Sequence, residues 1–380
     1  MDLAALRLTL FFTANLSLTE WQRLGMFERE TALYRALRPH LAGVAFVTYG
    51  DRQDLVQRER LAGIDIYCNR FSLSWPWYWR WLAGMPAGWK KGPVIFKSNQ
   101  VPGADTALAL ACRFGKPFVA RCGYLHSLAM GLRHGEESPE ALRAREREGR
   151  VFRGADRVVV TTPLMAGQAI GLHGLQPDRL RVIPNYVDVE RFAPAPREGE
   201  HTAGAVVLFV GRLDAQKDPA LLVAAMAGVD AELWLVGEGS LRVRLEEEAV
   251  ASGARVRFLG ICPHAALPAL MNRADLLVIA SPHEGHPKAL LEAMACGMAV
   301  IGRNDAPGVR EMIRHEVTGL VCDPTPEGMR AAIVRVLSDA ALKERLGRNA
   351  RAYAVAEFSL QRIVALELEL LQEIAQERFR

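Results

Sequence analysis

The sequence predicts an α/β protein built from two doubly wound domains, each with a parallel sheet. Its 380 residues are enough for two domains that each bury a core of their own. Short apolar runs typical of buried strands alternate with segments of helical periodicity along the whole chain. A stretch rich in proline and charge, residues 184–201, divides this pattern and indicates a linker.

The first half contains six strand-like runs with helical segments between them. The strands are expected at residues 6–13, 43–48, 93–96, 117–121, 157–161 and 180–183. The helices are expected to include residues 28–37, 105–114 and 139–152. Alternation of this kind favours a parallel sheet with helices on both faces. We therefore expect residues 1–195 to form the first domain.

The pattern resumes after the linker. Strands are expected at residues 205–210, 232–236, 256–259, 274–280, 299–302 and 319–322. We expect residues 196–359 to form the second domain, and the amphipathic helix of residues 360–380 to pack back on the first. Ligands of such sheets bind beyond the carboxyl ends of the strands, so two facing sheets place the site in the cleft between the domains.

Composition limits the class of protein. Half of the residues are hydrophobic and a quarter are charged, as in a soluble globular protein. The six cysteines are scattered without a CxxC pair, which favours reduced thiols in a cytoplasmic protein. Residues 1–195 hold 26 basic and 18 acidic residues, against 21 and 25 in the remainder. The basic half indicates an anionic partner or surface, or only an arginine-rich composition.

The most informative stretch, SPHEGHPKALLEAMACGMAVIGRNDAPGVR at residues 281–310, holds two carboxylates eight positions apart, Glu284 and Glu292. It follows an apolar strand, and Pro287 suits the first position of the helix that comes next. Glu292 is the only charge in that helix and needs polar partners, which two ligand hydroxyls would supply. Glu284 lies in the turn beside the helix N-terminus, where N–H groups attract anions. Phosphate binding beside polyol-binding carboxylates suits a nucleotide sugar.

A second group of charges follows the first strand of the second half, in VGRLDAQKDP at residues 210–219. Asp218 can cap a helix that begins at Pro219. Arg212 and Lys217 precede it and would fit a diphosphate, since Arg offers a fork of donors and Lys a compact charge. Isolated loop cations would simply be solvated. The Glu284 turn, however, should lie along the same edge of the sheet, which favours the diphosphate.

These motifs resemble those of the retaining glycosyltransferases of family 4, which have the two-domain GT-B fold. The resemblance covers most of residues 155–325 and is weak before them. The matching stretches are VIPNYVDVERFAP (182–194), VGRLDAQKD (210–218), WLVGEGSLRVRLEE (234–247), VRFLGIC (256–262), the 281–310 block and VTGLVCDP (317–324).

The resemblance implies a role for each matching residue. Glu284, Arg212 and Lys217 would be the catalytic residues: the two cations bind the donor diphosphate and Glu284 faces the transferred sugar. Glu292 would bind the ribose hydroxyls. The remaining donor contacts would come from backbone and loop positions, namely Gly211, Gly237, Cys262, Gly285, His286 and Lys288.

The resemblance also implies the reaction, which is transfer from a nucleotide-diphosphate sugar with retention at the anomeric carbon. The cations and the helix-end amides would stabilise the departing diphosphate. No DxD motif is present, so we expect no metal site and no cofactor apart from the donor substrate. We expect a sugar or lipid-linked acceptor and no nucleic-acid partner.

The first half departs from the family pattern. The loop at residues 13–21 lacks the usual glycines, and Cys122 stands where many members carry a histidine that contacts the sugar. Arg121 and His126 are candidates to line the cleft instead, although a lone histidine is more often a packing residue than a catalyst. Residues 97–100, Lys-Ser-Asn-Gln, either meet the acceptor or form a polar loop at the end of a strand.

The segment FSLSWPWYWRWL at residues 71–82 precedes WKK at residues 89–91. Tryptophan favours membrane interfaces, and basic residues favour anionic lipid. The segment therefore indicates either a peripheral contact with the inner face of the membrane or a packed aromatic loop or interdomain contact.

The expected function is that of a transferase making a polysaccharide, glycolipid or small-molecule glycoside. One alternative is a degenerate homologue that binds a sugar nucleotide without transfer. The departures in the first half are its only support, and the presence of Arg212, Lys217, Glu284 and Glu292 speaks against it. A GT-B-like sugar-nucleotide epimerase is a weaker alternative, because the Arg212–Lys217 loop argues against it. The absence of a GxGxxG motif after an early strand disfavours a dinucleotide oxidoreductase.

Overall fold

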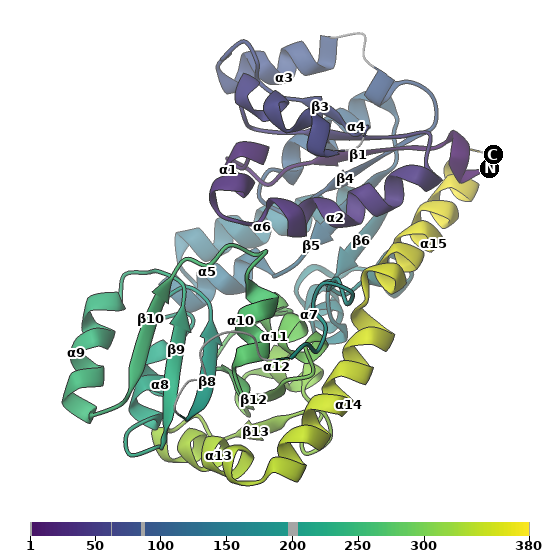
Figure 1. Cartoon of the computed structure of the whole chain (residues 1–380). Helices are drawn as coiled ribbons and strands as arrows, with labels where there is room; N and C mark the ends of the chain where they lie inside the picture. Colours follow the sequence, from purple (N-terminus) through teal and green to yellow (C-terminus); the bar gives the residue numbers. More distant parts are fainter. Residues whose placement is uncertain (1, 62, 85–87, 197–203, 380) are drawn as a thin grey trace. The chain divides into compact units, whose positions relative to one another are not determined.

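The computed structural model describes residues 2–61, 63–84, 88–196 and 204–379. The chain forms two compact units, Met1–Pro184 together with Ile363–Arg380, and Asn185–Arg362. Each unit is a parallel sheet with helices on both faces, which confirms the predicted fold class (Figure 1). Among the described helices, none combines the length and the apolar character needed to cross a bilayer.

The first sheet has seven parallel strands in the order β3-β2-β1-β4-β5-β6-β7. Their bounds are β1 (Arg7–Phe11), β2 (Gly43–Val47), β3 (Asp65–Tyr67), β4 (Val94–Ser98), β5 (Phe118–Cys122), β6 (Arg157–Val160) and β7 (Leu180–Val182). The strand order reverses between β1 and β4, where Leu8 lies opposite Val44 on one side and Ile95 on the other. These strands are nearly continuous apolar runs because both faces of a parallel sheet are covered.

Helices cover both faces of the first sheet. They are α1 (Leu18–Arg23), α2 (Phe27–Leu37), α3 (Trp75–Gly84), α4 (Ala104–Phe114), α5 (His126–His134), α6 (Pro139–Gly154), α7 (Pro163–His173) and α15 (Leu360–Arg378). Several begin where the sequence supplies a cap. Ser138, for example, is the N-cap of α6, and its side chain accepts a hydrogen bond from Ala141 N. Pro139 follows as the first residue of the helix.

The second sheet has six parallel strands in the order β10-β9-β8-β11-β12-β13. The strands are β8 (Ala205–Val210), β9 (Ala231–Val236), β10 (Val256–Gly260), β11 (Leu276–Ile279), β12 (Ala299–Arg303) and β13 (Leu320–Cys322). The helices are α8 (Pro219–Ala225), α9 (Arg242–Ser252), α10 (Leu267–Arg273), α11 (Lys288–Ala295), α12 (Pro307–Met312), α13 (Pro326–Ser338) and α14 (Ala340–Phe358). The order reverses between β8 and β11, and the crevice beyond such a reversal is where open α/β sheets bind ligands.

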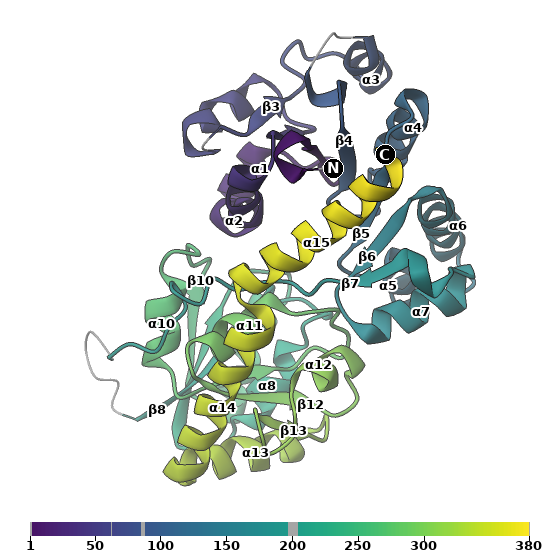
Figure 2. The same ribbon diagram turned by 90° about the vertical axis from the view of Figure 1, so that its right-hand side faces the viewer.

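The last helix, α15, is anchored to the first sheet. Lys97 of β4 donates to Glu367 over 2.5 Å, and both side chains are fully buried. Further along, Glu373 pairs with Arg157 of β6 at 2.7 Å and with Arg181 of β7. Figure 2 shows α15, in yellow, running across these strands. Lys97 is therefore an anchor of the C-terminal helix and is not available to an acceptor.

The segment that follows Pro184 joins the second unit, earlier than the expected boundary after residue 195. Val187 N donates to the carbonyl of Phe358 at the end of α14, and Leu360 N, at the start of α15, donates to the carbonyl of Val187. Phe192 is buried in the core of the second unit. Residues 197–201 of the predicted linker lie outside the described residues.

Candidate active site

The loop that follows β8 carries the two predicted cations. Asp218 ends the loop with φ +47°, and its side chain caps α8 by accepting from Leu221 N at 3.4 Å. The other oxygen of Asp218 accepts from the buried Arg303 of β12 at 2.8 Å. The guanidinium of Arg303 is also held by Asp305 at 2.7 Å, so the loop is tied to the neighbouring part of the sheet edge.

Lys217 and Arg212 have different partners within this loop. Lys217 Nζ lies 2.5 Å from Glu284 Oε1 and donates to it. Arg212 is exposed and lies 3.0 Å from Gln216 Oε1 and 3.2 Å from Asp214 Oδ2. The structure thus brings Lys217 to the predicted acidic turn, while the polar contacts of Arg212 with Gln216 and Asp214 lie within its own loop.

Two glycines let the loop after β9 pass close to this segment. A Cβ atom on Gly237, where φ is +136°, would lie 1.9 Å from the carbonyl oxygen of Gly211. A Cβ atom on Gly239 would lie 2.3 Å from the carbonyl oxygen of Leu213. No side chain fits at such distances, so these positions require glycine. Close backbone packing thus explains why residue 237 is a glycine. A contact of Gly237 with the nucleotide base remains a prediction.

The turn between β11 and α11 is fixed on both sides. Asn185 Nδ2 donates to the carbonyl of His286 at 2.8 Å, and the buried His286 ring packs edge-on against Phe358. On the other side, a Cβ atom on Gly308 would lie 2.1 Å from the carbonyl oxygen of Glu284, so α12 starts directly against the turn. These contacts fix the backbone of the turn that carries Glu284.

The first turn of α11 differs slightly from the prediction. Pro287 has ψ 117° and is the N-cap, so the helix begins at Lys288. Its first N–H groups, among them that of Lys288, lie at the positive end of the helix dipole. The N–H groups of Gly285 and His286 belong to the same turn, whereas Pro287 has none.

Glu292 has a partner that the sequence did not indicate. Glu292 is buried, with 3% of its surface exposed. Its Oε1 atom lies 2.8 Å from Nε2 of His264, on the loop after β10. The His264 ring packs against Phe192 with ring centroids 5.2 Å apart. Nδ1 of His264 is buried and has no partner among the described residues. If Nε2 carries the proton that Glu292 accepts, Nδ1 presents a lone pair as an acceptor.

Cys262 lies two residues before His264 and is half-buried, which raises the pKa of its thiol. Cys296, one turn after Glu292, is buried, and burial together with the Glu292 charge raises its pKa to about 12. Both thiols are therefore neutral near pH 7, and neither is an activated nucleophile.

The two predicted residues of the first unit lie at the carboxyl end of β5. Nη1 of Arg121 donates to the carbonyl of Asn99 at 3.3 Å. His126 begins α5, and burial lowers the pKa of its imidazole. Cys122, at the position of the family histidine, is fully buried and lies 2.9 Å from the carbonyl oxygen of Tyr124. It cannot replace a histidine as a contact with a sugar.

Comparison with protein families gives two matches that together cover both units. The model described as Glycosyltransferase Family 4 matches residues 31–191. The model described as Glycosyl transferases group 1 matches residues 194–353.

Curated relatives and solved structures agree with these matches. The D-inositol 3-phosphate glycosyltransferase of Salinispora tropica is 31% identical over 70% of this chain and 61% of its own length. Glycogen synthase of Mycobacterium tuberculosis is 28% identical over 74% of this chain and 68% of its own. The chain spans about three fifths of the length of the inositol phosphate glycosyltransferases that it matches.

Among solved structures, HepE of Anabaena in complex with UDP and glucose has a TM-score of 0.78 at 19% identity, covering 97% of this chain and 99% of its own. Sucrose-phosphate synthase of Thermosynechococcus elongatus has a TM-score of 0.79 at 22% identity, and the match covers 98% of this chain and 99% of the synthase chain. These likenesses show the fold. Since one family model matches each unit and the fold is shared, the chain belongs to glycosyltransferase family 4, with the GT-B architecture of two Rossmann-like domains.

Proposed function

We propose that this protein transfers a sugar from a nucleotide-diphosphate sugar to an acceptor hydroxyl. The observation that carries the proposal is the ion pair between Lys217 and Glu284, which joins the loops after β8 and β11. These strands are neighbours at the reversal of strand order, so the pair lies where such a sheet binds ligands. HepE, which shares this fold, forms complexes with UDP and with UDP-glucose.

The donor diphosphate would bind between the β8 loop and the start of α11. Lys217 has three N–H donors, so it can turn from Glu284 to phosphate oxygens or contact both. Arg212 is exposed and would complete the phosphate contacts from the same loop. The N–H groups of Gly285, His286 and Lys288 would supply further donors at the positive end of the helix.

The carboxylates would hold the two sugar rings of the donor. Ionised carboxylates only accept hydrogen bonds, and vicinal hydroxyls are suitable donors. Glu284, released in part from Lys217, would accept from the transferred sugar. Glu292 would accept from the ribose, with the base beside Gly211, Gly237 and Cys262.

The reaction would proceed with retention and without a metal ion. The bond from the anomeric carbon to the diphosphate oxygen breaks, and the acceptor oxygen attacks from the same face. The acceptor proton passes to the departing phosphate oxygen. Lys217, Arg212 and the helix-end amides stabilise the negative charge that develops there, which is the task a divalent cation performs in other enzymes.

The acceptor would be a sugar or a lipid-linked sugar bound by the first unit. Arg121 and His126 lie at the carboxyl end of β5, the edge at which such sheets bind ligands. We place the protein in the cytoplasm, at the inner face of the membrane, in polysaccharide or glycolipid synthesis.

A sugar-nucleotide-binding protein without transferase activity is the second candidate, because the buried Cys122 leaves the family's histidine position without a polar contact. The test is thermal unfolding with UDP-, GDP- and ADP-sugars, followed by release of the nucleotide in the presence of sugar acceptors. We expect one donor class to raise the melting temperature and to be turned over. Stabilisation without turnover would favour the second candidate, and no stabilisation would reject both.

A further inference from the structure

The surface around α3 combines exposed aromatic rings with basic residues. Phe71, Trp75 and Trp77 are 57%, 41% and 62% exposed. Residues 66–91 contain four basic residues and no acidic residue. Such a combination is uncommon on a surface that faces only water, because large aromatic residues are usually buried.

Two of the exposed rings carry an arginine on their face. Cζ of Arg80 lies 5.2 Å from the centre of the Trp77 ring, and Cζ of Arg70 lies 4.8 Å from that of Phe71. Neither arginine forms an ion pair within the part of the chain that the structure describes. Stacking on a ring leaves the guanidinium edge, with its N–H donors, directed to another group.

The periodicity of α3 separates this face from the core. Tyr78 and Leu82 are fully buried, and the Tyr78 hydroxyl donates to the carbonyl of Thr48 at 3.0 Å. Trp77 and Arg80 are three residues apart and so lie together on the opposite, solvent side. The core is therefore complete without Trp77, and the exposure of this residue is not explained by packing within the unit.

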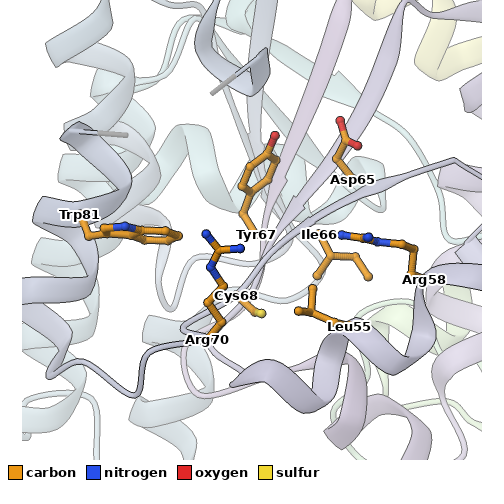
Figure 3. A pocket seen from close by; sticks show the side chains of 8 residues that line it. All are labelled: Leu55, Arg58, Asp65, Ile66, Tyr67, Cys68, Arg70 and Trp81. Atoms are coloured by element: carbon orange, nitrogen blue, oxygen red, sulfur yellow. The ribbon is translucent and has the colours of Figure 1, made fainter. Parts of the chain in front are cut away.

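A cavity of about 190 Å³ lies next to this face, between the 3₁₀ segment Arg52–Leu61, the edge strand β3 and α3 (Figure 3). It is lined by Leu55, Arg58, Asp65, Ile66, Tyr67, Cys68, Arg70 and Trp81. Figure 3 shows the guanidinium of Arg70 turned toward the Trp81 ring, whose centre is 5.6 Å away. Arg58, which also lines the cavity, forms no ion pair among the described residues. Two arginines, Arg58 and Arg70, thus extend the basic surface from the helix to the cavity, where the carboxylate of Asp65 is the one acidic group among the lining residues.

We propose that Phe71, Trp77, Arg70 and Arg80, called here the α3 face, dock on an anionic phospholipid bilayer. The two rings enter the headgroup region, where amphipathic aromatic side chains are favoured. The guanidinium groups donate to lipid phosphates, and Arg58 adds charge at the margin. The docking deepens the proposed function, since it brings the enzyme to lipid-linked acceptors. The benefit of docking rests on that function, whereas binding to the bilayer itself does not.

The experiment is co-flotation of the full chain with vesicles in the absence of donor and acceptor. We expect binding to phosphatidylcholine vesicles that contain about one third phosphatidylglycerol, and loss of binding without the anionic lipid or at about 0.5 M salt. Because each basic residue at an anionic surface contributes roughly fivefold, R70Q/R80Q should weaken the partition constant about thirtyfold. W77A should weaken it as well, because it removes a ring that favours the headgroup region.

The matched controls remove the same groups from other surfaces of the first unit. R133Q/R145Q removes two exposed arginines of α5 and α6, and L132A removes an apolar side chain of α5 that is 59% exposed. All variants should keep the melting temperature of the original protein. Absence of binding to the anionic vesicles, or equal losses in the control and α3-face variants, would overturn the proposal. Self-association through this face in place of vesicle binding would overturn it as well. None of these outcomes bears on donor binding, which the nucleotide-sugar measurement tests separately.

Discussion

Lys217 Nζ and Glu284 Oε1 lie 2.5 Å apart, although 67 residues separate them in the chain. They meet because each follows a strand of the second sheet, and β8 and β11 are paired in parallel. The carboxyl ends of the two strands thus place the cation and the acid at one edge. The pair orients both side chains before a donor binds, which is the preorganisation that electrostatic stabilisation of a leaving group needs.

Replacing either member of this pair should reduce transfer without unfolding the protein. We expect Lys217→Ala and Glu284→Ala to lower kcat/KM about 10²- to 10³-fold, as removal of one stabilising group typically does. Their stability should change by only about 1 kcal/mol, because the pair is partly exposed. Nucleotide release and urea unfolding measure the two quantities.

Two exposed residues of the same unit, neither in an ion pair among the described residues, provide matched controls. Arg257→Ala removes a cation from β10, and Glu247→Ala removes an acid from α9. Both should keep full activity. Full activity of Lys217→Ala and of Glu284→Ala as well would reject the site.

His264 should act on donor binding through Glu292. His264→Ala leaves a buried carboxylate without its 2.8 Å partner, so we expect a loss of about 2 kcal/mol in the free energy of unfolding. If Glu292 binds the ribose, the variant should also lose part of the preference for UDP, GDP or ADP over the 2′-deoxy form. Calorimetric titration measures that ratio, which a purely structural role would leave unchanged. His264→Gln, which can still donate a hydrogen bond, should recover part of both effects.

The buried pair of Lys97 and Glu367 should be essential to the docking of α15. Lys97→Met leaves a buried carboxylate unpaired and should cost about 3–5 kcal/mol in the free energy of unfolding. The double variant Lys97→Met/Glu367→Met removes both charges and should recover most of that loss. Urea denaturation of the single and double variants gives the coupling energy. Additive losses would show that the two side chains do not depend on each other.

His126 should make stability depend on pH. Burial lowers the pKa of its imidazole, although the nearby charge of Glu148 opposes this effect. The unfolded chain therefore binds the proton at a higher pH than the folded protein does. Stability from this group is complete above about pH 6.5 and falls as the pH drops through the unfolded pKa toward the lower folded value. We expect the melting temperature of His126→Gln to fall less between pH 7 and 5, about the range over which histidine titrates, than that of the original protein. An equal fall in both would contradict the assignment.

Apolar runs were enough to predict most of the fold. The apolar run at residues 274–280, for example, predicts a buried strand, and the structure places β11 within it, at Leu276–Ile279. The strand Asp65–Tyr67 was not predicted because three residues with a charge at one end carry no periodicity. The helix α3 was not predicted either, since Pro76 and four tryptophans obscure its amphipathic pattern.

Local sequence motifs were enough to predict part of the candidate site. Glu284 and Lys217 follow strands, and parallel topology brings such positions together. The pairing of His264 with Glu292 has no sequence signal, because β10 and β11 are not neighbours and the contact depends on how the loop after β10 folds over α11. Lys97 appeared as part of a polar strand end, and only its partner 270 residues later explains its burial.

The central claim is that a nucleotide-diphosphate sugar binds at the Lys217–Glu284 pair. The most direct measurement is the melting temperature of the original protein and of Lys217→Ala with saturating UDP-, GDP- and ADP-glucose. Ligand at about a thousand times its Kd stabilises the native state by about 4 kcal/mol, so we predict a clear rise for one donor class that Lys217→Ala largely loses. A rise of equal size in Lys217→Ala, or no rise with any donor, would contradict the claim.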